Sequence, residues 1–180
     1  MTRRLLAVLA AGALFATPAA LRAQGSTSIL VSGGLSVPMS DLSDGANSGY
    51  NLNLGLAFGA PFIPVGARIE GGLNSFDLKG GDGSVRMISG TANAVLNLGP
   101  TSGAPYLIGG LGIYNRRFSD SPLGVNVPSR NTAGVNIGGG VRFPLGGIST
   151  FLEARYHVML GKDTEGTNYQ FIPITFGIQF

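Results

Sequence analysis

Apolar residues alternate with small or polar residues along most of this chain, and that two-residue period restricts it to β-structure. Every second residue from Leu52 to Phe58 is Leu or Phe, with Asn, Gly or Ala between them. The stretch Ile172–Phe180 alternates Ile or Phe with Pro, Thr, Gly and Gln. Because successive side chains of a strand point to opposite faces, both stretches predict strands with one apolar face. From Ser26 onward no helical periodicity persists for three turns, so the sequence predicts an all-β protein.

The alternation recurs in eight segments, which clusters of Gly, Pro, Asn, Asp and Ser separate. The predicted strands are Thr27–Val37, Tyr50–Ala60, Val65–Phe76, Val85–Leu98, Pro105–Arg117, Asn131–Phe143, Ser149–Leu160 and Tyr169–Phe180. The connections after the odd-numbered strands are long and polar, whereas those after the even-numbered strands are short and contain Pro or Gly. This asymmetry predicts an antiparallel up-and-down barrel with both termini at the end of the short turns. The facing of the fifth strand stays open, because both of its faces are apolar or Gly.

A soluble barrel buries its apolar face, whereas a membrane barrel turns that face to lipid. Here the opposite face consists of Gly, Ser, Asn and Thr, and only 12% of all residues are charged, although about 25% is usual for a soluble domain. Arg68, Glu70, Arg142, Glu153 and Arg155 share the parity of this small, polar face, which fits a narrow lumen. We therefore expect an eight-stranded transmembrane β-barrel. Aromatic residues are expected at its rims: Tyr50, Tyr156 and Tyr169 at one end, and Phe58, Phe143 and Phe180 at the other.

The first 23 residues have the layout of a secretory signal peptide. Arg3 and Arg4 precede an apolar run, Leu5–Ala16, which is short for a membrane span. A permanent signal anchor is the alternative. Cleavage is possible after Ala19, Ala20 or Ala23. The predicted domains are the signal peptide at residues 1–23 and the barrel at residues 24–180.

The basic character of the chain belongs to this leader. Arg3, Arg4 and Arg22 account for three of the 12 basic residues, so 9 remain beside 9 acidic residues and the net charge of the barrel is zero. The high isoelectric point therefore gives no reason to expect a nucleic-acid partner. The chain contains no Cys, which excludes disulfides and thiolate metal sites.

These features resemble the small outer-membrane β-barrel family, the eight-stranded type found as the barrel half of outer membrane protein A. The resemblance covers about Gln24 to Phe180, and the run Pro105–Gly112 resembles a strand typical of these barrels. It implies location in the cell outer membrane, the lipid bilayer as a partner, and a monomeric state. It also implies recognition by the barrel-assembly machinery through a C-terminal signal. The residues that would form this signal are Ile174, Phe176, Ile178 and Phe180.

The candidate functional residues are the ionisable side chains on the lumen faces of three strands. They are Arg68, Glu70, Arg142, Glu153, Arg155 and His157. We interpret them as a charged network that plugs the lumen, since side chains mostly fill the interior of an eight-stranded barrel. The expected function is then a structural or surface-interaction role. The alternative is a narrow porin-like pore in which these charges gate or select solutes.

An outer-membrane lipid-modifying enzyme is a third, less favoured hypothesis. Catalysis by His157, the only histidine, would need a nucleophile and an acid to orient it. Enzymes of this architecture use His with Ser, but Met159 occupies the offset of the serine. We therefore predict no catalytic site, cofactor or metal. Asp41, Asp44 and Asn47 could hold a hard cation, but their spacing favours a polar connection over Met39–Gly49.

Overall fold

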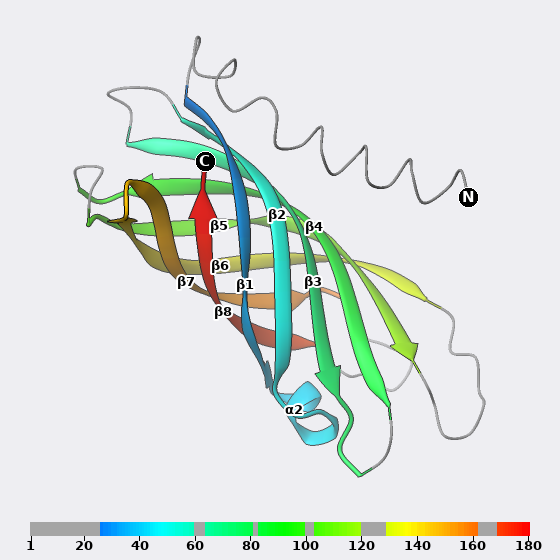
Figure 1. Ribbon diagram of the computed structural model, residues 1–180. Helices are drawn as coiled ribbons and strands as arrows, with labels where there is room; N and C mark the ends of the chain where they lie inside the picture. Colours follow the sequence, from blue (N-terminus) through cyan, green and yellow to red (C-terminus); the bar gives the residue numbers. More distant parts are fainter. Residues whose placement is uncertain (1–25, 60–63, 81–82, 100–102, 120–128, 162–168) are drawn as a thin grey trace, which may run out of the picture.

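The computed structural model describes residues 26–59, 64–80, 83–99, 103–119, 129–161 and 169–180. Its strands form one closed antiparallel barrel, in which each strand pairs with the next and the last pairs with the first (Figure 1). The strands are β1 (Ser26–Met39), β2 (Gly49–Gly59), β3 (Val65–Asp77), β4 (Ser84–Asn97), β5 (Pro105–Ser119), β6 (Arg130–Leu145), β7 (Ile148–Met159) and β8 (Gln170–Gln179). All eight predicted strands are confirmed, each end to within two residues. The predicted leader, Met1–Ala23, lies outside the described residues.

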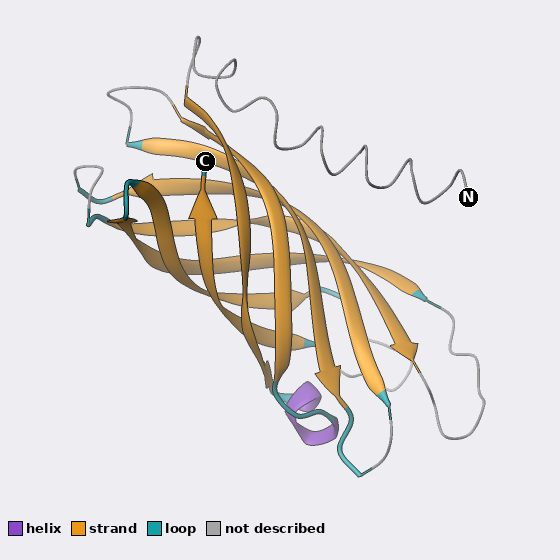
Figure 2. Ribbon diagram, viewed as in Figure 1, coloured by secondary structure: helices purple, strands orange, loops and turns teal. Residues whose placement is uncertain are grey.

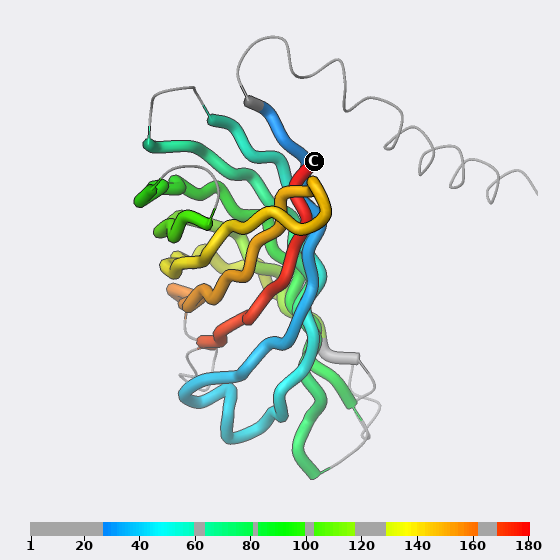
Figure 3. Tube along the Cα trace, turned by 60° about the vertical axis from the view of Figure 1, so that its left-hand side comes forward, coloured from blue at the N-terminus to red at the C-terminus, as the bar shows by residue number. Residues whose placement is uncertain are grey.

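The two ends of the barrel differ. The start of β1 and the C-terminus lie together at the end of the barrel where β2, β4 and β6 connect to the next strand (Figures 1 and 3). We call this end the turn end. In the β6–β7 turn, Gly146 and Gly147 have φ angles of 59° and 83°, a left-handed conformation that favours glycine. The opposite end, which we call the loop end, carries the helix α2 (Asp41–Gly45) (Figure 2).

The outer surface of the barrel is a belt of apolar side chains. On β2, Leu54 is 51% exposed, whereas Asn51 on the opposite face is 1% exposed. The same division settles the fifth strand, where Leu111 faces outward and Tyr106 and Tyr114 face inward. The predicted outward direction of the apolar faces is thus confirmed. In the part of the chain that the structure describes, no helix is long and apolar enough to cross a membrane.

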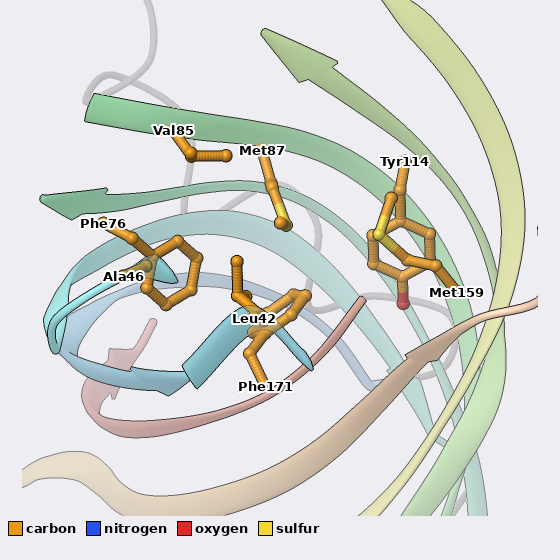
Figure 4. Packing of buried hydrophobic residues seen from close by; sticks show 8 residues of the cluster. All are labelled: Leu42, Ala46, Phe76, Val85, Met87, Tyr114, Met159 and Phe171. Atoms are coloured by element: carbon orange, nitrogen blue, oxygen red, sulfur yellow. The ribbon is translucent and has the colours of Figure 1, made fainter. Parts of the chain in front are cut away.

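Apolar side chains fill the lumen at the loop end, which the sequence did not predict. The helix α2 places Leu42 and Ala46 inside the barrel mouth, where Leu42 lies among the rings of Phe76 and Phe171 (Figure 4). This loop-end cluster consists of Leu42, Ala46, Phe76, Val85, Met87, Tyr114, Met159 and Phe171. The expectation that Met39–Gly49 is only a polar connection was therefore wrong. Its short helix turns Leu42 inward as a cap, and Ala46, directly after the helix, is buried beside it.

A second correction concerns Tyr169, which we expected at the outer rim. Tyr169 packs against the loop-end cluster, and the guanidinium carbon of Arg116 lies 4.0 Å from the centre of its ring. The physical reason is parity. Tyr169 shares the face of the buried Phe171, two residues further along the chain, and therefore points inward.

Close strand packing at Gly110 gives a first testable prediction. A Cβ added to Gly110 would lie 2.1 Å from the carbonyl oxygen of Ala92, whereas one added to Gly90 meets no atom within 4 Å. We expect Gly110→Ala to lower the free energy of unfolding by about 1–3 kcal/mol, because the wall must shift to admit the methyl group. Gly90→Ala is the matched control, with an expected change within about 0.5 kcal/mol. Urea unfolding of the barrel in detergent micelles measures both. Equal stability of the two variants would contradict the prediction.

Candidate functional site

Four charged side chains meet inside the barrel, two from β3 and two from β7. Arg68 and Glu70 are two residues apart on β3, and Glu153 and Arg155 are two residues apart on β7. Within each strand this spacing puts both side chains on the same, inward face. The two strands do not pair with each other, so the side chains meet across the lumen. We call these residues the four-charge network.

The charges alternate in sign around the network. Arg68 Nη1 lies 2.7 Å from Glu153 Oε2, and Arg155 Nη1 lies 2.7 Å from Glu70 Oε2. Arg155 Nε also lies 2.7 Å from Glu153 Oε1, an ion-pair contact without a well-aligned hydrogen bond. The fourth contact, between Arg68 Nη1 and Glu70 Oε1, is longer at 3.7 Å. The four residues are 1% to 5% exposed, and their formal charges sum to zero.

Neutral side chains donate further hydrogen bonds to one oxygen of each carboxylate. The Tyr106 hydroxyl donates to Glu153 Oε2 at 2.7 Å, and Asn93 Nδ2 donates to Glu70 Oε2 at 3.1 Å. Asn136 in turn donates to Asn93 Oδ1 at 2.8 Å. A buried charge is tolerable only when it is paired and hydrogen-bonded, and these donors supply the second requirement.

The other two predicted site residues lie on either side of the network. Arg142 lies toward the turn end, where its Nη1 donates to Asn97 Oδ1 at 3.1 Å. His157 lies toward the loop end, where its Nδ1 is 2.8 Å from the Tyr114 hydroxyl and its ring stacks on Phe171. Among the described residues, neither forms an ion pair with a carboxylate. The structure thus brings four of the six predicted residues together.

Sequence reasoning missed Tyr106, Asn93 and Asn136. The two asparagines carried a usable signal, since both lie on predicted lumen faces beside charged strands. Tyr106 carried none, because both faces of its strand looked apolar. The missed apolar residues of the turn end are Leu30, Val95, Tyr106, Ile108 and Phe151, which we call the turn-end cluster.

The network lies in the middle of the lumen, with apolar side chains on both sides of it. The network lies between the loop-end and turn-end clusters, and the guanidinium carbon of Arg68 lies 5.2 Å from the centre of the Phe151 ring. Within the described residues, the Tyr114 hydroxyl is the one hydrogen-bond partner of His157, so no serine or carboxylate contacts the imidazole. No group of three or more His, Cys, Asp or Glu side chains suited to a metal ion occurs in those residues either.

Comparison with solved structures identifies the architecture. The surface protein A of Neisseria superposes with a TM-score of 0.68 at 15% identity, over 85% of this chain and 95% of the other. The attachment invasion locus protein Ail of Yersinia pestis gives a TM-score of 0.52 at 20% identity, over 87% and 99% of the two chains. The N-terminal barrel of OprF of Pseudomonas aeruginosa gives 0.52 at 17% identity, over 87% and 100%.

No protein-family model and no curated protein matches the chain. The structural likeness therefore concerns the fold, together with the closed topology and the outward apolar belt described above. The chain has the fold of the small eight-stranded outer-membrane β-barrels.

Proposed function

We propose that this chain is an integral outer-membrane protein with a structural or surface-interaction role, whose lumen is plugged rather than conducting. The observation that carries the proposal is the layered filling of the lumen. The four-charge network lies in the middle, the loop-end cluster covers one side and the turn-end cluster covers the other. Arg68, Tyr106 and Phe151 are each 1% exposed, which leaves little room for a hydrated solute beside them.

The outer surface supports insertion in a bilayer. A water-facing barrel would expose charged side chains, but the exposed face here carries large apolar residues on every strand from β1 to β8. The proposal includes the predicted signal peptide and a monomeric state. It also includes recognition of Ile174, Phe176, Ile178 and Phe180 by the barrel-assembly machinery. Ile174, Phe176 and Phe180 are exposed on the outward face, where a partner could contact them during assembly.

The location is tested by fractionating cells that express the full chain. We expect the protein in the outer-membrane fraction, with faster migration on a detergent gel before heating than after, as a folded barrel resists the detergent. Recovery of the chain as a folded protein in the soluble fraction would refute the proposal.

The plug gives a second testable prediction, measured as single-channel conductance in planar bilayers. We expect the wild-type barrel to produce no stable ion-current steps, because two apolar clusters interrupt any water path. The alternative is the narrow pore, which polar lumen residues such as Asn51 and Thr175 favour. Stable steps that change in Glu153→Ala or Arg155→Ala would establish the pore and refute the plug.

The non-enzymatic part of the proposal rests on the contacts of His157. Its neighbours Tyr114 and Phe171 hold the ring and supply neither a serine nor a carboxylate. Release of acyl chains from lipid A by the wild type, abolished in His157→Ala, would contradict this part alone.

A further inference from the structure

The outward face of β3, β4 and β5 carries a shallow apolar groove of about 410 Å³. Gly90 and Ala92 of β4 form its floor, Ile69 stands on the β3 side, and Leu111 and Ile113 stand on the β5 side. All five residues are exposed. The floor is low because Gly90 has no side chain, and a Cβ added there would meet no atom within 4 Å.

Two arginines stand on the same outward face, toward the loop end. Arg86 and Arg117 are register partners on β4 and β5, and both are exposed. Residues at even steps along a strand share a face, so Arg86 points the same way as Gly90 and Arg117 the same way as Ile113. Arg86 is four residues from Gly90, which is about 13 Å at the rise of a β-strand. The arginine pair therefore lies at the edge of the apolar belt, above the groove.

Within the part of the chain that the structure describes, no carboxylate neutralises the positive charge of this pair. Like charges directly opposite on paired strands repel each other. Within the described ranges, neither guanidinium forms an ion pair with a carboxylate. This also holds for Asp77, which pairs in register with Ser84, two residues before Arg86.

A hydrogen bond to a neighbouring asparagine orients the Arg117 side chain. Its Nε donates to Asn115 Oδ1 at 3.0 Å, and Asn115 Nδ2 donates to Asn131 Oδ1 at 2.7 Å. The chain thus positions two adjacent cations at one place on its lipid-facing surface. An anionic group between them would remove their repulsion, and arginine forms paired, charge-assisted hydrogen bonds with phosphate.

We propose that this surface binds one phosphorylated glycolipid of the leaflet at the loop end. A phosphate lies between Arg86 and Arg117, and one acyl chain lies along the groove over Gly90. The site rests on the proposed function, since location in the outer membrane with the loops outward places the arginine pair at the outer leaflet. Charge complementarity selects an anionic headgroup, and the apolar groove beneath it selects a ligand with an acyl chain.

Native mass spectrometry of the folded full chain from detergent micelles tests the proposal, with bisphosphorylated lipid A as the probe. We expect one lipid A per barrel. The double variant Arg86→Ala/Arg117→Ala should weaken binding about tenfold or more, because it removes both charge-assisted contacts. Gly90→Phe should weaken binding by a similar factor by filling the groove, and the Cβ of the new side chain meets no atom within 4 Å.

The controls remove the same charge or add the same bulk elsewhere. Arg130→Ala removes an exposed arginine at the same end, on the inward-facing parity of β6, and Ala154→Phe adds an aromatic ring to the exposed outward face of β7. Both should bind lipid A like the wild type. Lipid A stripped of its phosphates should bind at least about tenfold more weakly, because it offers the arginine pair no anion. Phosphatidylglycerol should also bind more weakly, because its phosphodiester carries one negative charge whereas a phosphate monoester carries about two.

Four results would overturn the proposal. The first two are lipid A binding by the double arginine variant, or by Gly90→Phe, that equals binding by the wild type. The third is binding of phosphate-free lipid A or of phosphatidylglycerol that equals binding of bisphosphorylated lipid A. The fourth is a two-chain complex that Gly90→Phe dissociates. The last would assign the groove to a second copy of the chain. Heat-dependent gel migration reports folding of each variant separately. A wild type that does not fold into micelles or vesicles refutes the proposed function, whereas a folded barrel without lipid preference refutes this inference alone.

Discussion

We expect Glu153→Ala to lower the free energy of unfolding by about 3–5 kcal/mol, because removing one member of a buried ion pair leaves its partners uncompensated. Glu153 contacts both Arg68 and Arg155 at 2.7 Å and accepts the hydroxyl of Tyr106. Its loss leaves two buried guanidinium groups beside one remaining carboxylate, that of Glu70. The network then carries a net positive charge in a site that water reaches poorly.

Urea unfolding of the barrel in detergent micelles measures this loss, and the double variant Arg68→Ala/Glu153→Ala sharpens the test. The double change leaves Arg155 and Glu70 as one neutral pair at 2.7 Å. We therefore expect the double variant to lose at least about 1 kcal/mol less than the sum of the two single variants. Strict additivity would mean that the two side chains are not coupled in the folded barrel.

Arg142→Ala is the matched control for this prediction. Arg142 is also an arginine on the lumen face, but it is half-buried and bonds to Asn97 rather than to a carboxylate. We expect this substitution to cost about 1 kcal/mol, the usual contribution of a single hydrogen bond. A loss as large as that of Glu153→Ala would show that burial of any lumen cation, rather than the ion-pair network, determines the effect.

The second large effect is expected on the outer surface, where Ile174→Arg should lower the free energy of unfolding in phospholipid vesicles by about 2–4 kcal/mol. Ile174 lies in the middle of β8 and is 45% exposed on the outward face. In a membrane barrel this position faces hydrocarbon, and a guanidinium there loses its hydration. Urea unfolding of the vesicle-inserted barrel measures the loss.

The depth of the substituted residue provides the control. Ile148, the first residue of β7, is 44% exposed but lies at the turn end, near the membrane surface. Ile148→Arg should therefore cost about 0–1 kcal/mol in the same vesicles. Equal costs at the two positions would contradict a bilayer around the barrel, because an arginine on a water-facing surface costs the same at the middle of the barrel as at its end.

The strands and their facing could be predicted because both are local properties. A residue's parity within a strand decides whether it points inward or outward, so Leu54 and Asn51 were assigned correctly from sequence alone. The lengths of the connections then allowed only an up-and-down order. The same rule would have placed Tyr169 correctly. Tyr169 is two residues from Phe171, so the two side chains share the inward face.

The contacts inside the lumen depend on how the barrel closes. The spacing of Arg68 and Glu70, and of Glu153 and Arg155, shows that each pair shares a face, but β3 and β7 are never neighbours in the sheet. Which residues of two opposite strands face each other depends on strand tilt and stagger around the whole barrel. No pattern in the sequence reports that stagger, and for this reason Arg142 was grouped with charges that it does not contact.

The two-residue period, the apolar outward faces and a lumen face of Gly, Asn and charges of both signs follow from the amino-acid sequence, because side-chain parity needs only the local backbone. The pairing of Arg68 with Glu153, the cap formed by Leu42 of α2, and the alignment of Arg86 with Arg117 above a groove follow only from the closed barrel. These contacts join residues far apart in the chain, and closure of β1 onto β8 sets their distances.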